Sequence, residues 1–161
     1  MRKERTSGGR SPASLGGASR RMAIGCGLAL LSAPLAAATP EQAVLAPVNA
    51  FLAGIGSGDK AVMLATALPD GGLVSMKDGK ARRMSIPDLV AKMPPAGEGL
   101  DERIHDPLVR IDGDLAVVWA PYVFTIKGKP HHCGTDLFNL VRIEGRWTIA
   151  SVADTEGVCA S

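Results

Sequence analysis

The fold of this 161-residue chain is decided by its C-terminal part, "ERIHDPLVRIDGDLAVVWAPYVFTIKGKPHHCGTDLFNLVRIEGRWTIASVADTEG", residues 102–157. Four runs rich in β-branched and aromatic residues alternate here with short turn signals. We expect strands at roughly 102–111, 114–126, 131–143 and 146–154, joined at "DG", "KGKP" and "EG". Turns this short connect neighbouring antiparallel strands, so the segment predicts a four-stranded antiparallel meander.

The residues before this segment have a helical pattern instead. "TPEQ", Thr39–Gln42, is a capping box with proline at the first helical position, and apolar residues then recur at helical spacing. Asp59 is suited to cap a second helix and Ser85 a third, with a small hairpin turning at Asp78-Gly79 between them. This order predicts an α+β fold in which a curved antiparallel sheet wraps the helices.

The first 38 residues predict an export signal. Basic residues precede the apolar run "MAIGCGLALLSAPLAAA", which ends in small residues suited to cleavage near Ala38. The run is too short and too rich in small residues for a durable membrane span. We therefore expect an exported protein, periplasmic or secreted, whose domain is residues 39–161 and which has no membrane attachment after cleavage. The pair Arg20-Arg21 is compatible with the twin-arginine route.

Removing the leader reverses the sign of the net charge. It holds six of the 18 Lys and Arg residues and one of the 16 acids, which leaves 12 bases and 15 acids, a net charge of −3. No basic patch with interleaved aromatic residues remains, so nucleic acid is not an expected partner. The length that remains fits one domain with one core.

Short hairpins fix which side chains share a face of the sheet. The simplest register closes each hairpin at its turn, with the pairs Ile111–Asp114, Ile126–His131 and Ile143–Arg146. It predicts an inner face with Ile104, Asp106, Leu108, Val117, Trp119, Val123, His132, Asp136, Phe138, Leu140 and Ile149. It predicts an outer face with Val109, Val118, Tyr122, Phe124, Cys133, Leu137, Val141, Val152 and Asp154. Helices can cover only one apolar face, so we expect a homodimer through the other.

The cluster "KPHHCGTDLF", residues 129–138, raises the question of a metal site. On a regular strand His131 and His132 point to opposite faces, and no other Cys or His motif has ligand spacing. We therefore expect neither a metal nor another cofactor. His132 and Asp136 share a face but lie about 13 Å apart at ~3.3 Å per residue, so they are not a hydrogen-bonded dyad. They can both project into one cavity.

Cys133 and Cys159 form an even pair once the leader, which contains Cys26, is removed. In an oxidising compartment such a pair favours a disulfide. Pairing of the last two strands places Cys133 opposite Glu156, only three residues before Cys159. The predicted bridge closes a loop of about 26 residues, which corresponds to about 3–4 kcal/mol of stabilisation in the loop-entropy model.

The stretches "VVWAPYVF", "HCGTDLF", "LVR" and "GRWTIA" resemble the nuclear transport factor 2-like superfamily. They are most similar to its exported bacterial SnoaL-like proteins described as "putative lumazine-binding". The resemblance covers most of residues 40–159. It implies a cone-shaped α+β barrel, a cavity between the helices and the curved sheet, and dimerisation through the sheet. The superfamily includes isomerases, cyclases, hydrolases, dehydratases and binding proteins, so the fold does not imply one activity.

Three functional hypotheses follow. The first is a pocket for a small, largely apolar molecule, with Trp119, His132, Asp136 and Phe138 as its lining. The second is a cofactor-free isomerase, lyase or hydrolase in which Asp136, Asp106 and His132 perform acid–base chemistry, because an apolar cavity raises the pKa of a carboxyl group. Against it, either acid can instead be a structural hydrogen-bond acceptor. The third is a structural domain that binds another protein through its sheet.

Overall fold

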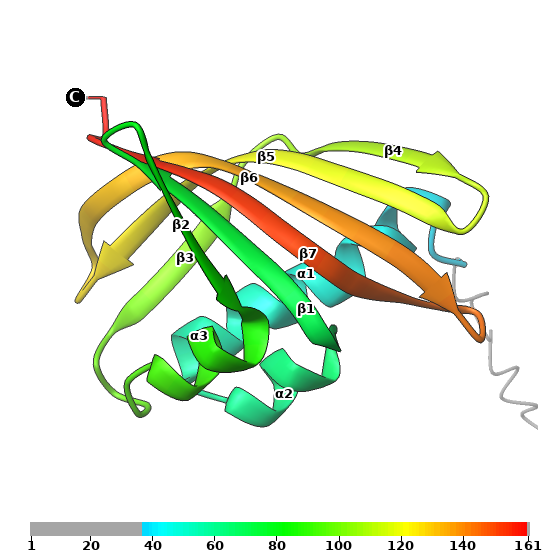
Figure 1. The fold of residues 1–161 in the computed structure, drawn as a ribbon, viewed down its shortest axis with the longest axis horizontal. Coiled ribbons are helices and arrows are strands. Elements are labelled where there is room, and N and C mark those ends of the chain that lie inside the picture. The colour runs from blue at the N-terminus through cyan, green and yellow to red at the C-terminus, as the bar shows by residue number, and fades with distance from the viewer. Residues whose placement is uncertain (1–36, 161) are drawn as a thin grey trace, which may run out of the picture. The chain divides into compact units, whose positions relative to one another are not determined.

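The computed structural model describes residues 37–160, and three helices there cover one face of a curved seven-stranded sheet (Figure 1). The predicted export signal, residues 1–38, lies outside the described residues except for its last two. Within the described part, no helix is both long enough and apolar enough to cross a bilayer. The elements are α1 Pro40–Ser57, α2 Lys60–Ala65, β1 Ala67–Lys77, β2 Lys80–Ser85, α3 Ile86–Lys92, β3 Leu100–Ile104, β4 Leu108–Asp112, β5 Leu115–Ile126, β6 Lys129–Ile143 and β7 Arg146–Gly157.

The helices begin at the caps that the sequence predicts. The Thr39 hydroxyl accepts a hydrogen bond from the Gln42 amide at 3.2 Å, and the Gln42 side chain accepts from the Thr39 amide at 2.9 Å. Asp59 caps α2 through two backbone amides, and the Ser85 hydroxyl caps α3 by accepting from Asp88 at 3.1 Å. Each cap satisfies backbone donors that a helix start otherwise leaves unpaired.

The strands follow the order β2-β1-β7-β6-β5-β3, and β4 also pairs with β5. The α+β fold with a curved sheet is therefore confirmed. The first predicted strand is divided by residues 105–107 into β3 and β4, and Asp106 has a positive φ of 43° in this break. The parallel pairing of β1 with β7 was not predicted, and it makes the sheet mixed.

The predicted register between β5 and β6 is wrong by one residue. Ile126 pairs with Lys129, so the turn has two residues, Lys127 and Gly128, which both have positive φ. The turn alone shifts the pairing by two residues, and a bulge at His131 reverses one of them, so Phe138 lies opposite Val118, where the simple register predicts Trp119. Because side chains alternate along a strand, a slip of one residue exchanges the two faces of β5 relative to β6.

Two β-bulges complete the assignment of faces. In β6 the pairing passes from His132 to Pro130, which leaves His131 as the extra residue. In β7 the pairing passes from Ile149 to Ser151, which leaves Ala150 as the extra residue. The second bulge turns Val152 and Asp154 toward the helices, whereas the simple register predicts both on the outer face.

The core lies between the helices and the inner face of the sheet. Its fully buried large side chains come from both layers, and they are Val44, Val48, Met63, Ile86, Val90, Val118, Phe138, Leu140 and Ile149. The opposite face has no helix over it in Figure 1, and its side chains Leu108, Leu115 and Trp119 are about half exposed, at 48%, 54% and 51%. Among the described residues the sheet therefore has one covered apolar face and one open apolar face.

A disulfide ties the C-terminal tail to the sheet. Cys133 and Cys159 are bonded, with their Cα atoms 4.9 Å apart, which is the pair expected from the sequence. The bulge at Ala150 places Gly157 rather than Glu156 opposite Cys133. The bridge spans a sequence separation of 26 residues and holds β6 and the tail together beside the strand end that carries His132.

Candidate functional site: carboxyl groups in the inner cavity

A cavity of about 280 Å³ lies between the helices and the inner face of the sheet. The helical side contributes apolar side chains, Phe51 and Ile55 from α1, Leu89 from α3 and Met93 directly after α3. The sheet contributes the polar ones, Ser75, Arg82, Glu102, Tyr122, His132, Asp136, Asp154 and Glu156. The cavity is thus apolar on the helical side and acidic on the sheet side.

Two of the acids lie side by side in one row across the sheet, which we call the carboxyl row. Asp136 of β6 pairs with Ala120 of β5 on one side and with Asp154 of β7 on the other. Ser75 of β1 pairs with Asp154 in turn and donates a hydrogen bond from its hydroxyl to Asp154 Oδ1 at 2.6 Å. Directly paired residues on one face have Cβ atoms about 4.5–5.5 Å apart, so the two carboxyl groups are immediate neighbours.

Asp136 is the buried acid with an unsatisfied oxygen. Its side chain is 3% exposed, and its Oδ2 has no hydrogen-bond partner among the described residues. A buried polar atom without a partner costs free energy, and such atoms are rare in folded proteins. The sequence-based alternative, in which Asp136 is a structural acceptor, therefore finds no support at Oδ2.

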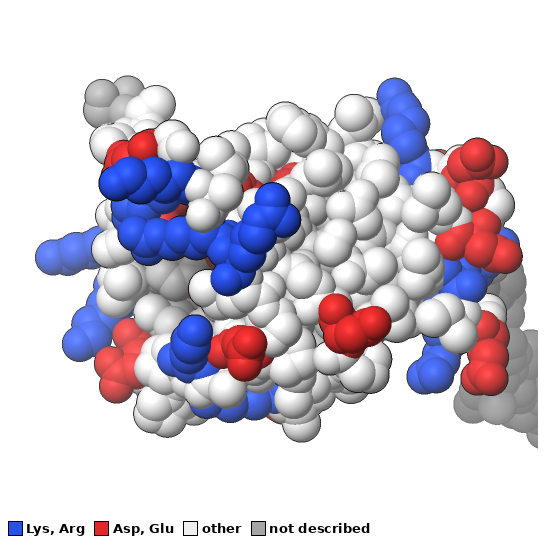
Figure 2. Space-filling model, viewed as in Figure 1, with Lys and Arg blue, Asp and Glu red and all other residues white. Residues whose placement is uncertain are grey.

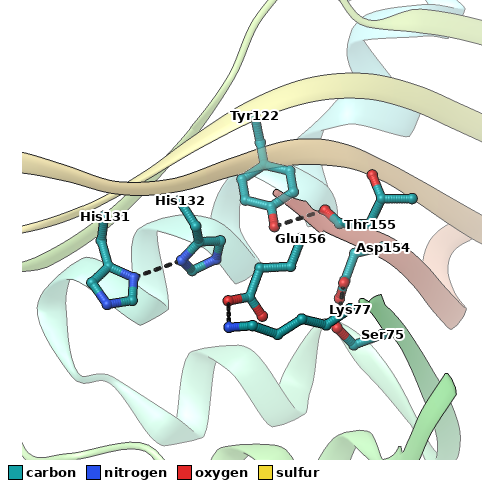
Figure 3. A network of polar contacts seen from close by, with 8 residues as sticks. All are labelled: Ser75, Lys77, Tyr122, His131, His132, Asp154, Thr155 and Glu156. Carbon is teal, nitrogen blue, oxygen red and sulfur yellow. Dashed lines mark hydrogen bonds and ion pairs between the residues drawn. The ribbon is translucent and has the colours of Figure 1, made fainter. Parts of the chain in front are cut away.

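The row beside the carboxyl row contains Tyr122, Gly134, Glu156 and Lys77 in consecutive strands. The Tyr122 hydroxyl donates a hydrogen bond to the Thr155 carbonyl at 3.1 Å, and Lys77 forms an ion pair with Glu156 (Figure 3). A Cβ atom at Gly134 would lie 2.9 Å from the Tyr122 ring and only 1.7 Å from the Thr155 oxygen. Because Gly134 has no side chain, the Tyr122 ring has room to lie over β6 and reach Thr155 on β7.

His132 stands at the end of the cavity against aromatic rings. It stacks on Phe124 with ring centroids 4.7 Å apart and meets Tyr122 edge to face at 5.7 Å. The bulge also brings His131 to the same side, with the two Nδ1 atoms 2.9 Å apart (Figure 3). The prediction that these two histidines point to opposite faces is therefore wrong, because it assumed a regular strand.

The environment shifts the pKa values of the acids upward. Burial, and then the adjacent Asp154, raises the pKa of Asp136 from 3.8 to about 7. Burial, and then the charges of Asp136, Asp154 and Asp101, raises the pKa of Glu102 well above its usual range. The pKa of Asp154 is also raised by burial, although the Ser75 hydrogen bond opposes the shift. These groups therefore hold protons at a pH where an exposed carboxyl group does not.

The remaining titratable groups of the cavity are shifted in other directions. The hydrogen bond from Lys77 lowers the pKa of Glu156. Burial lowers the pKa of His132, with the Glu156 charge opposing, which favours the neutral ring. Burial and the neighbouring acids raise the pKa of Tyr122, so its hydroxyl keeps its proton. The cavity thus contains one compensated acid, Glu156, and several acids without a nearby base.

The structure brings together part of the predicted site. His132, Asp136 and Phe138 line the cavity as expected. Trp119 does not, because the register shift places it on the open face, and Asp106 is exposed in the break between β3 and β4. Sequence reasoning missed Glu102, Tyr122 and Asp154. The correct register turns Tyr122 inward and the second bulge turns Asp154 inward. Glu102 lies on the same side of β3 as Ile104, which was expected on the inner face, so alternation alone could have identified it. Within residues 37–160, no three His, Cys, Asp or Glu side chains are grouped to hold a metal ion.

The helix-covered curved sheet with an inner cavity defines an NTF2-like (nuclear transport factor 2-like) fold. The chain belongs to the family described as "Putative lumazine-binding", whose model matches residues 39–153. No curated protein sequence matches the chain. These results agree with the resemblance seen in the sequence.

Solved structures support the fold class. An NTF-2-like protein of unknown function from Silicibacter pomeroyi superposes with a TM-score of 0.57 at 19% identity, covering 71% of this chain and 93% of that one. An NTF2-like protein of unknown function from Shewanella baltica gives 0.57 at 21% identity, covering 76% and 100%. A protein of unknown function with a cystatin-like fold from Nostoc punctiforme gives 0.60 at 12% identity, covering 74% and 93%. At these identities the likeness concerns the fold alone.

The raised pKa of Asp136 predicts a pH-dependent stability. The folded protein holds a proton that the unfolded chain releases near pH 3.8, so the free energy of unfolding falls as the pH rises from about 4 to about 7. Asp136→Asn, which cannot ionise, should remove about 2–4 kcal/mol of this loss. Urea unfolding at pH 4.5 and pH 8 measures the difference. The exposed Asp112→Asn is the control, and parallel profiles for wild type and Asp136→Asn would contradict the assignment.

Proposed function

We propose that this protein binds a small, largely apolar molecule in the inner cavity. The unpartnered Oδ2 of Asp136 supports the proposal most strongly, because a ligand donor would satisfy an atom that no described residue satisfies. Apolar walls with a few convergent polar groups are typical of small-molecule sites. The unfilled volume of about 280 Å³ favours this function over that of a purely structural interaction domain.

The size and walls of the cavity limit the class of ligand. About 280 Å³ is close to the lower end of known ligand pockets, so we expect a molecule of one or two rings. Phe124, stacked on His132, and the edge of Tyr122 provide surfaces suited to a flat ring. Lumazine, the compound in the family description, is a flat two-ring heterocycle and is the first candidate to test.

The second candidate function is acid–base catalysis without a cofactor. A carboxyl group with a pKa of about 7 is suited to take up and return a proton near neutral pH, and Asp136 is such a group. Asp106 has no part in this proposal because it is exposed outside the cavity. If an enolisable ligand turns over, Asp136→Asn should abolish turnover while retaining ligand binding. Unchanged turnover in that variant would exclude Asp136 as the acid–base group.

We also propose that the protein is exported and that its mature form is a homodimer through the open sheet face. The half-exposed side chains of Leu108, Leu115 and Trp119 support the dimer, because a second copy would cover them. The signal-like pattern of residues 1–38 and the Cys133–Cys159 disulfide support export, since disulfides persist in oxidising compartments.

Native mass spectrometry of protein purified from its own host tests these proposals together. We expect a mass equal to two chains that begin near Thr39, plus one small molecule per chain that is released on denaturation. Val152 is buried and lines the cavity. The Val152→Phe variant should lose the bound molecule, because the larger side chain fills the site. Apoprotein at every purification step would count against ligand binding. A monomer mass would exclude the dimer, and a full-length chain would exclude cleavage.

A further inference from the structure

We propose that the cavity selects a flat cation that donates N–H hydrogen bonds, such as an amidinium or a protonated amino-heterocycle, with Asp136 and Asp154 as its acceptors. This inference rests on the proposed function and specifies the chemistry of its ligand. Two observations support it: the arrangement of charged groups in the cavity, and the Oδ2 atom of Asp136, which has no hydrogen-bond partner among the described residues.

Among the described residues, Glu156 is the one cavity acid that has a basic partner. Four carboxyl groups line the cavity, those of Glu102, Asp136, Asp154 and Glu156. Glu156 has an ion pair with Lys77, and Asp154 has one hydrogen bond from Ser75. Asp136 Oδ2 has no partner among residues 37–160. A group of acids in an apolar cavity is stabilised when a cation enters, and the low local dielectric strengthens that attraction.

The geometry of the carboxyl row suits a planar donor. Asp136 and Asp154 are paired across β6 and β7, so their oxygens lie side by side on one face. A planar group with two N–H donors on one edge can reach adjacent acceptors at once, as guanidinium and amidinium groups do with carboxylates. The row ends at Ala120, which is buried in the core and has no polar side chain to pair with Asp136.

The aromatic residues favour the same class. The Tyr122 hydroxyl donates its hydrogen bond to Thr155, so it is not available to a ligand acceptor, and the Tyr122 ring lines the cavity. The stacked pair of Phe124 and His132 provides another flat surface, and aromatic faces attract cations. Lys and Arg side chains lie at both ends of the molecule (Figure 2). Arg82 of β2 lines the cavity and Lys77 of β1 pairs with Glu156. They leave the carboxyl row itself without a base.

The opposite ligand class gives the opposite dependence on pH. Protonated carboxyl groups could donate hydrogen bonds to an anion or to a neutral acceptor, and such binding would strengthen as the pH falls. The charged and titratable groups that line the cavity with Asp136 are Asp154 and Glu156 on β7, Glu102 on β3, Tyr122 on β5, His132 on β6 and Arg82 on β2, and Lys77 on β1 pairs with Glu156. The helices α1 and α3 contribute apolar side chains to the cavity.

Isothermal titration calorimetry with three probes of one shape separates these classes. The probes are benzamidine, which is a cation, benzamide, which is neutral, and benzoate, which is an anion. We expect benzamidine to bind at least tenfold more tightly than either of the others. Because Asp136 must lose its proton, the affinity for benzamidine should be about tenfold lower at pH 6 than at pH 8. Buffers of different ionisation enthalpy should report proton release at pH 7.

Two variants assign the effect to the carboxyl row. Asp136→Asn should lower the affinity for benzamidine at least tenfold at pH 8 and remove its pH dependence, whereas the exposed control Asp112→Asn should change neither. Asp154→Asn should also weaken benzamidine binding, and it tests the row independently if Asp136→Asn does not fold. Circular dichroism verifies the fold of each variant.

The remaining outcomes overturn the inference in distinguishable ways. If benzamide or benzoate binds as tightly as benzamidine, or if affinity rises toward pH 6, the cavity binds small molecules but does not select cations. The proposed function then stands without this inference. If no probe binds at millimolar concentration, the inference fails, and the co-purified molecule sought by mass spectrometry decides the proposed function separately.

Discussion

The pairing of Ala120 with Asp136 determines which side chains enter the cavity. The two-residue turn at Lys127-Gly128 and the bulge at His131 together fix this register, and the alternation of side chains then carries it along both strands. It turns Tyr122, Phe124, His132 and Asp136 toward the helices and leaves Trp119 on the open face. A slip of one residue would remove Tyr122 and Phe124 from the cavity and place Trp119 inside. The chemistry of the site therefore depends on this turn and on the two bulges, at His131 in β6 and at Ala150 in β7.

This register has an energetic cost. It buries Asp136 beside Asp154 in a largely apolar cavity, and the protein keeps its carboxyl groups protonated at the expense of stability at neutral and higher pH. Apolar residues at the same positions would pack without that cost. An acid that lowers stability and lacks a partner is characteristic of a functional site, since structural polar groups are normally satisfied. The same features that destabilise the empty cavity favour a ligand able to complete its hydrogen bonds.

Local signals in the sequence were sufficient to predict the elements of the fold. The capping residues Thr39, Asp59 and Ser85 identify the helix starts, and the turn dipeptides identify most of the hairpins. The cysteine pair could be predicted because either register places Cys133 of β6 opposite the end of β7, two or three residues before Cys159. The parallel pairing of β1 with β7 could not be predicted, because it joins segments far apart in the sequence and no turn connects them.

The candidate site was predicted less well, because it depends on register rather than on composition. His132, Asp136 and Phe138 share one strand, so their common face follows from alternation alone. Trp119 and Asp106 were placed in the cavity by a register that was wrong by one residue and by a strand that is in fact broken. Asp154 was missed because a bulge at Ala150 has no clear signal in the sequence. Reading "KGKP" as a two-residue Lys-Gly turn would not by itself have corrected β5, because its faces exchange only with the bulge at His131.

The central claim is that Asp136 is a buried, uncompensated acid inside a ligand cavity. A titration of the aspartate carboxyl carbons by ¹³C NMR tests it most directly, with Asp136 assigned by the signal that disappears in Asp136→Asn. We expect this carbon to titrate with a midpoint near pH 7 in the empty protein. We expect the midpoint to fall when a cationic ligand is bound. A midpoint near the ordinary value of 3.8 in the empty protein would contradict the claim.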